Sequence, residues 1–328
     1  MTEDLASSIA AVLVDRGVVP DGVGVEGLRR LSGGASRETW AFVVSEEASP
    51  LHRVHGMILQ RERPGGSRTG GGMASEAVLL RAAELVGVPV PEVLATDDGG
   101  DEMGAPFVIT RAVPGETIPR KLLRDPELDD VRGHLARECG RILAEIHSVP
   151  VASVRDVLTE PDQIVQFRDL LDALGEPHPA FELAFRWLDR FRPDGLEAAL
   201  VHGDFRNGNL IIGPDGVRAV LDWELAHLGD PVEDLGWFCV RAWRFGSPHR
   251  AGGFGSAEDL LAGYRDGGGA EVDLETLRWW EVMGTLKWGV MCVIQAMTHL
   301  AGASRSVELA AIGRRTCENE WDLLELIS

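Results

Sequence analysis

The chain has 328 residues, of which 45% are hydrophobic and 26% charged, and its formal net charge is −20. This length allows two domains or one large one, and the composition is that of a globular enzyme. The acidic balance argues against a nucleic-acid binder, and no apolar run approaches the roughly 18 residues that a membrane helix needs. The N-terminus lacks the basic start of a secretory signal, and the four cysteines lie far apart, so we expect a cytoplasmic protein with reduced thiols.

Residues 1–113 are predicted to be rich in β-strands. Apolar spacing indicates a helix over 3–16, and alternation with turn residues indicates a strand, a glycine-containing turn and a second strand over 28–44. The predicted elements that follow are a strand at 56–63, a glycine-rich loop at 64–72, a helix at 73–87, and strands at 90–98 and 105–113. The segment VPGET, Val113–Thr117, looks like a linker.

Residues 114–328 are predicted to be mainly helical. Helical spacing of apolar residues indicates a helix over 128–146, with further helices near 180–192, 231–243, 257–265, 273–301 and 305–327. The exception is 199–222, where two short apolar runs around Gly213–Gly216 predict a β-hairpin.

The stretch VHGDFRNGNLII, Val201–Ile212, carries the clearest chemistry. Asp204 and Asn209 stand five positions apart, which is the spacing of the Asp and Asn in a protein-kinase catalytic loop, although Gly203 replaces the usual Arg. Asp222 follows thirteen residues after Asn209, at the end of an apolar run. Asp204 would be the catalytic base, and Asn209 with Asp222 would bind magnesium. Taken alone, the same residues are also consistent with a polar turn.

Further candidates for nucleotide binding lie in the first 113 residues. The turn Ser32, Gly33, Gly34, Ala35 and Ser36 could offer backbone N–H groups to phosphates. This part of the chain contains no lysine, so we assign the phosphate-binding cation to Arg61, with Gln60 as the alternative one residue earlier. Glu76 would orient Arg61, and the backbone from Arg111 to Val113 would contact the adenine.

These motifs occur in an order that resembles the aminoglycoside phosphotransferase family, a kinase-like group that also includes choline kinases and has H-G-D where protein kinases have H-R-D. The segment from Leu200 to Trp237 is the most specific part, and its acid Asp234 would support the catalytic loop. The tryptophan-rich C-terminal part is similar to kinase-like domains associated with acyl-CoA dehydrogenases. The resemblance implies an α+β, two-lobed protein-kinase-like fold, with a small β-rich lobe at 1–113 and a larger, mainly helical lobe at 114–328.

The same resemblance implies transfer of the γ-phosphoryl group of ATP, with GTP as an open alternative, to a hydroxyl of a small molecule, using two Mg²⁺ ions. A dedicated aminoglycoside-resistance kinase and a catalytically silent nucleotide-binding regulator are the alternatives, and the chain could be a monomer or a homodimer. Five tryptophans could line an acceptor pocket or pack in the core: Trp237, Trp243, Trp279, Trp280 and Trp288. Six acids could bind a polycation or lie on exposed helix faces: Glu233, Asp234, Glu281, Glu318, Glu320 and Asp322. The tryptophan-rich stretch slightly favours a less charged acceptor.

Overall fold

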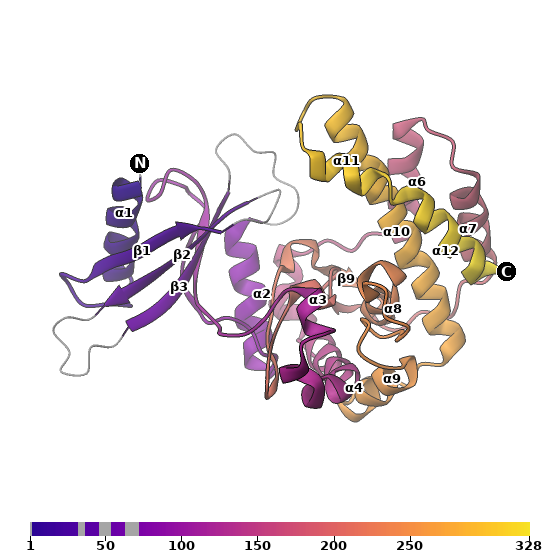
Figure 1. Ribbon diagram of the computed structural model, residues 1–328, viewed down its shortest axis with the longest axis horizontal. Helices are drawn as coiled ribbons and strands as arrows, with labels where there is room; N and C mark the ends of the chain where they lie inside the picture. Colours follow the sequence, from indigo (N-terminus) through magenta and orange to yellow (C-terminus); the bar gives the residue numbers. More distant parts are fainter. Residues whose placement is uncertain (1, 32–36, 46–53, 63–71) are drawn as a thin grey trace.

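The computed structural model describes residues 2–31, 37–45, 54–62 and 72–328 of the chain. It has a small sheet-containing lobe and a larger helical lobe, which lie next to each other along the long axis of the molecule (Figure 1). The predicted two-lobed α+β fold is therefore confirmed. No helix among the described residues combines the length and the apolar character needed to cross a membrane.

The smaller lobe is built on a five-stranded antiparallel sheet with the strand order β1-β2-β3-β5-β4 in the part of the chain that is described. Helix α1 packs on one face, where Leu59 is fully buried, and α2 packs on the other face, where its Met73 and Ala77 cluster with Val108 of the sheet. Figure 1 shows α2 between the sheet and the helical lobe. The elements are α1 (Thr2–Asp15), β1 (Gly24–Arg30), β2 (Arg37–Ser45), β3 (Val54–Glu62), α2 (Met73–Leu85), β4 (Val93–Asp97) and β5 (Phe107–Arg111).

The larger lobe is organised around the long helix α10, which contacts α6, α7, α8, α11 and α12. Its helices are α3 (Pro119–Leu122), α4 (Asp129–His147), α5 (Val151–Val154), α6 (Gln163–Leu174), α7 (Pro179–Arg190), α8 (Val232–Cys239), α9 (Ala257–Asp266), α10 (Leu274–Leu300), α11 (Val307–Gly313) and α12 (Thr316–Ile327). The single helix expected over 305–327 is wrong, because the chain forms two helices that each pack on α10.

Helix α6 was not predicted, although its ends carry clear sequence signals. The side chain of Asp162 accepts hydrogen bonds from the first backbone N–H groups of the helix, and Gly175 ends it in the left-handed conformation. An N-cap acid and a C-terminal glycine around an amphipathic stretch would have been enough to propose this helix.

Two short two-stranded ribbons frame the segment around Asp204. Strand β6 (Ala199–Val201) pairs with β9 (His227–Gly229), and β7 (Leu210–Gly213) pairs with β8 (Gly216–Val220). The second ribbon is the β-hairpin that the sequence predicts. Because the pairs are nested along the chain, residues 202–209 and 221–226 form two facing loops.

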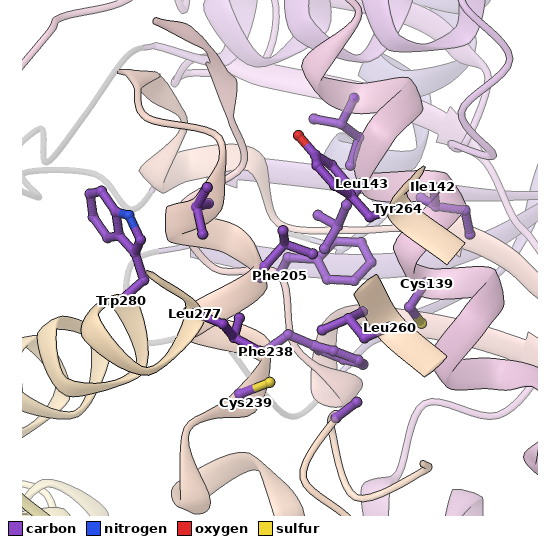
Figure 2. Packing of buried hydrophobic residues seen from close by; sticks show 14 of the residues in the cluster. Cys139, Ile142, Leu143, Phe205, Phe238, Cys239, Leu260, Tyr264, Leu277 and Trp280 are labelled. Carbon is purple, nitrogen blue, oxygen red and sulfur yellow. The ribbon is translucent and has the colours of Figure 1, made fainter. Parts of the chain in front are cut away.

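The core of the helical lobe anchors one of these loops directly. Phe205, the residue after Asp204, has no exposed surface, and its ring centre lies 5.4 Å from that of Phe238 in α8. Figure 2 shows Phe205 among buried side chains such as Leu143 of α4, Leu260 of α9 and Leu277 of α10. Burial of an aromatic ring at this position holds the adjacent Asp204 backbone in place.

Candidate functional site

The two facing loops are joined by hydrogen bonds on both sides of Asp204. The amide of Leu221 donates to the carbonyl oxygen of Asn209 at 2.8 Å, and Nε2 of His202 lies 3.1 Å from the carbonyl oxygen of Leu221. These bonds place Asp222, the residue after Leu221, beside the loop that contains Asp204 and Asn209. The structure thus brings together the three residues that the sequence singles out.

His202 is a fixed, neutral part of this arrangement. Its Nδ1 accepts a hydrogen bond from the amide of Asp204 at 3.2 Å, so the ring proton must lie on Nε2, where it is donated to Leu221. Burial lowers the pKa of His202, although Asp234 and Asp204 oppose this effect. His202 therefore ties the two loops together without carrying a charge.

Asp234 at the start of α8 holds the backbone of the catalytic loop. Its carboxylate accepts hydrogen bonds from the amides of His202 and Gly203 at 2.8 and 2.9 Å, and Nε2 of His147 lies 3.1 Å away. Burial alone would raise the pKa of Asp234, but the hydrogen bonds from His147 and the loop backbone keep it below its usual value. The predicted support of the loop by Asp234 is confirmed.

Gly203 is required by both conformation and space. Its φ of +77° lies in the left-handed region that favours glycine, and a Cβ atom there would collide with the carbonyl oxygen of Leu225. The replacement of Arg by Gly in this motif therefore has a structural cause, which is the close packing of the two loops.

A buried lysine, which the sequence analysis missed, lies behind the same loop. Nζ of Lys287 in α10 donates to the carbonyl oxygen of Gly203 at 2.9 Å and to Glu233 at 3.0 Å. It also lies 4.7 Å from the centre of the Trp237 ring. The available signal was a charged residue within the apolar run of the helix predicted at 273–301, in a chain that has only two lysines.

The carboxylate of Asp204 is surrounded by hydrogen-bond donors. Nε1 of Trp237 donates to Oδ1 at 3.0 Å, Nδ2 of Asn209 donates to Oδ2 at 2.7 Å, and Nε of Arg206 lies 3.1 Å from both oxygens. Arg206 also stacks on Trp243, with 5.0 Å between its guanidinium carbon and the ring centre. These contacts orient Asp204 and occupy most of its acceptor positions.

Asn209 and Asp222 offer a partial set of oxygen ligands. Because Nδ2 of Asn209 donates to Asp204, its Oδ1 is the atom available to a metal. Asp222 has φ 67° and ψ 65°, an unusual backbone conformation for a residue other than glycine. Burial, followed by the carboxylates of Glu224 and Asp204, raises the pKa of Asp222 to about 7. In the described residues, no group of three His, Cys, Asp or Glu side chains forms a ready metal site.

The smaller lobe differs from the sequence prediction in its ion pairs. Glu76 of α2 forms an ion pair with Arg37 at the start of β2. The expected pairing of Arg61 with Glu76 is wrong, because Nη2 of Arg61 lies 2.7 Å from Glu38, and its Nη1 donates to the carbonyl oxygen of Met103.

The physical reason is the direction in which the side chains of β3 point. Leu59 is buried against the cluster under α1, and strand alternation places Arg61 on that same face. Gln60 pairs with Thr39 and Val108 in register, so it lies on the opposite face with α2. Arg61 and its alternative Gln60 therefore lie on opposite faces of the sheet, and only Gln60 lies on the face that carries α2 and Glu76.

The expected adenine-binding segment has some of its backbone groups already in use. The amide of Arg111 donates to the carbonyl oxygen of Glu92, and the amide of Ala112 donates to that of Gly56. Within the described residues, no such backbone hydrogen bond involves Val113. The predicted phosphate-binding turn, Ser32–Ser36, lies outside the described residues.

The five tryptophans and three of the six acids considered for acceptor binding are buried. All five tryptophans are buried, which confirms core packing. Glu233, Asp234 and Glu281 are buried as well, so their expected exposure on helix faces is wrong. Each of the six acids has a cationic or histidine partner. The buried acids pair with Lys287 and His227 (Glu233), with His147 (Asp234), and with Arg244 and Arg250 (Glu281). Glu318, Glu320 and Asp322 pair with Arg315, His178 and Arg241, and the side chains of Glu318 and Arg241 are exposed.

Comparisons with known proteins agree with this geometry. The sequence profile of the phosphotransferase enzyme family matches residues 27–280. The chain is 29% identical over 248 residues to acyl-CoA dehydrogenase family member 10 of Mus musculus, covering 71% of this chain. The fold is similar to a choline/ethanolamine kinase family protein from Mesorhizobium loti (TM-score 0.64, 21% identity, coverage of 99% and 95%). It is also similar to aminoglycoside 2'-phosphotransferase-IIIa in complex with GDP (TM-score 0.67, 15% identity, coverage of 97% and 99%).

The match to the mouse protein covers only 22% of that protein's length. A second relative, acyl-CoA dehydrogenase family member 11 of Gallus gallus, is 30% identical over 65% of this chain and is matched over 28% of its own length. The chain therefore spans about a quarter of these curated relatives.

Proposed function

Because the chain belongs to the phosphotransferase enzyme family, we propose that it transfers the γ-phosphoryl group of ATP to a hydroxyl group of a small molecule. The observation that carries this proposal is the joining of the two loops, in which Leu221 binds the backbone of Asn209 and so places Asp222 beside Asp204. A base and two oxygen ligands in one place are what phosphoryl transfer to a hydroxyl requires.

In this proposal Asp204 accepts the proton of the acceptor hydroxyl. The hydroxyl oxygen forms a bond to the γ-phosphorus while the bond from that phosphorus to the bridging oxygen of ADP breaks. Trp237 and Asn209 hold the carboxylate of Asp204 in a fixed orientation through their hydrogen bonds. Asn209 and Asp222 fit the preference of Mg²⁺ for one or two protein oxygens together with substrate phosphates. When bound there, the ion neutralises phosphate charge.

Arg206 has to leave Asp204 before the acceptor can bind. Its Nε contacts both carboxylate oxygens, so a substrate hydroxyl has to compete with it for an acceptor position on Asp204. The side chain is about one quarter exposed, and in this proposal it rotates away from Asp204 when the acceptor binds. We assign the released guanidinium to the transferred phosphoryl group, where a positive charge stabilises the transition state.

The nucleotide is proposed to bind between the lobes. The backbone of Val113 would contact the adenine, and the N–H groups of Ser32–Ser36 would bind phosphate oxygens. The structural neighbour bound to GDP is consistent with a nucleotide in this fold, and it keeps GTP as an alternative donor.

The charges in the helical lobe favour an acceptor that is not a polycation. Cationic antibiotics need acidic side chains that are free to bind them, whereas three of the six acids considered for that role, Glu233, Asp234 and Glu281, are buried in ion pairs or hydrogen bonds. This pattern disfavours a dedicated aminoglycoside kinase and favours a hydroxylated metabolite of low charge.

The test is an ADP-release screen with pooled aminoglycosides, hydroxy acids, hydroxyacyl-CoAs, choline analogues and sugars. We expect acceptor-dependent ADP release from at least one pool of low charge, and none with the Asp204→Asn variant. Thermal stabilisation by MgATP without turnover on any pool would instead support a nucleotide-binding regulator.

A further inference from the structure

We infer that Arg37 of β2, and not a residue of β3, is the cation of the smaller lobe that binds the phosphates of the nucleotide. This inference rests on the proposed function. It assigns to Arg37 the phosphate-binding role that the sequence analysis gives to Arg61. It starts from the ion pair between Arg37 and the buried Glu76 of α2.

The position of Arg37 in the sheet supports this role. Arg37 pairs in register with Glu62, and Thr39 pairs with Gln60, so these side chains share the face of the sheet that carries α2. That face is directed toward the helical lobe (Figure 1).

A second contact connects Arg37 to the helical lobe. Its Nε lies 3.6 Å from Oε2 of Glu224, which stands two residues after the proposed metal ligand Asp222. The guanidinium is therefore held between Glu76 of one lobe and Glu224 of the other, with only 10% of the side chain exposed. An arginine fixed from two sides is already positioned to bind an anion, so little conformational entropy is lost when it does.

The chemistry of the guanidinium allows it to bind phosphate without giving up these partners. The two carboxylates contact Nη1 and Nε, while a guanidinium presents five N–H donors in a planar fork. Binding a phosphate oxygen therefore does not require either ion pair to break. Three carboxylates, Glu76, Glu224 and Asp222, surround Arg37, so the net charge around it is negative. A negative site favours binding of the nucleotide together with Mg²⁺ ions.

Arg61 cannot serve in the same way. It lies on the α1 face, where Glu38 and the carbonyl oxygen of Met103 accept its hydrogen bonds. Reaching the α2 face would require the side chain to pass through the sheet.

The experiment measures the affinities of the whole protein for MgATP, MgADP, AMP and adenosine. Arg37→Ala is expected to weaken MgATP binding by about 10- to 100-fold, the range for losing a hydrogen bond to a charged group. Adenosine affinity should stay within about twofold, and Arg37→Lys should recover part of the loss because it keeps the charge. The matched control is Arg30→Ala, which removes a half-exposed arginine paired with Glu38 on the other face and should leave all affinities unchanged.

Several results would overturn the inference. Unchanged MgATP affinity in Arg37→Ala, or a loss of the same size for adenosine, would show that Arg37 does not bind phosphate. A phosphate-dependent loss in Arg61→Ala alone would restore the assignment to β3. If Arg37→Ala does not fold, Arg37→Gln takes its place under the same criteria. If the unmodified protein binds no nucleotide, the proposed function is overturned as well. If it binds MgATP and Arg37→Ala binds it equally well, only the assignment of Arg37 is overturned.

Discussion

The ammonium nitrogen of Lys287 lies 2.9 Å from the carbonyl oxygen of Gly203, the residue before Asp204. The same ammonium contacts Glu233 at 3.0 Å, and Nε2 of His227 lies 3.0 Å from that carboxylate. All three side chains are buried. A buried charged network thus holds the backbone of the loop that contains Asp204.

Lys287→Met is expected to lower the free energy of unfolding by about 3–5 kcal/mol, because Glu233 would stay buried without its lysine. Urea denaturation at neutral pH measures this change. The matched control is Lys121→Met, the only other lysine, whose exposed ion pair with Glu116 should contribute about 1 kcal/mol or less. Equal effects of the two substitutions would contradict the assigned role.

Arg206→Ala is expected to lower kcat by about 10- to 100-fold, the cost of a lost charged hydrogen bond. The affinity for MgATP should change little, because the proposed contact forms in the transition state. Steady-state kinetics on the acceptor found in the ADP-release screen separates the two parameters. A rise in kcat would mean instead that Arg206 only blocks Asp204.

Magnesium-dependent nucleotide binding is expected to weaken as the pH falls below about 7. Asp222, with its pKa raised to about 7 by burial and neighbouring carboxylates, binds a metal only after it loses its proton. Titrations of ATP with and without Mg²⁺ between pH 5.5 and 8.5 should show the loss only in the Mg²⁺ series. In Asp222→Asn this pH dependence should disappear together with the effect of Mg²⁺.

The same pKa predicts a change in the stability of the metal-free protein. A raised pKa means that the folded state binds the proton more tightly than the unfolded state, so this stabilisation is present at low pH and is lost as the pH rises through about 7. Without metal, Asp222→Asn should therefore have a higher Tm than the unmodified protein at pH 8. A lower Tm at that pH would contradict the assignment.

Gly203→Ala is expected to destabilise the protein by about 1–3 kcal/mol and to reduce activity, because a side chain is strained at this φ and meets Leu225. Gly133→Ala is the matched control. Gly133 lies within α4 with open space around it, and the substitution should stabilise the protein by up to about 1 kcal/mol. Thermal unfolding of both variants gives the comparison.

The sequence was sufficient to predict the fold and the segment around Asp204, because both depend on local signals. Alternating apolar runs, turn glycines and the spacing of Asp204, Asn209 and Asp222 can be read directly along the chain. Because β6 pairs with β9 and β7 pairs with β8 inside that pair, Asp222 lies close to the loop that contains Asp204 and Asn209.

The partner of Glu76 could not be predicted in the same way. Helices cover both faces of the sheet, so the alternation of side chains in β3 does not say which face carries α2. A shift of one residue in the strand moves Gln60 to the face of Arg61 and Arg61 to the face of Gln60. The true partner, Arg37, comes from another strand. The burial of Glu233 and Glu281 was hidden for a related reason, because the cations beside them are distant in sequence or on other helices.

The close packing of Gly203 on Leu225 also limits how this protein can be switched on and off. Protein kinases are often activated when an arginine pairs with a phosphorylated residue in a mobile loop. The position before Asp204 has no room for any side chain here, and its backbone is held by the buried Asp234 and Lys287. In the proposed function, the loop around Asp204 therefore reaches its arrangement without an arginine at position 203 that could pair with a phosphorylated residue.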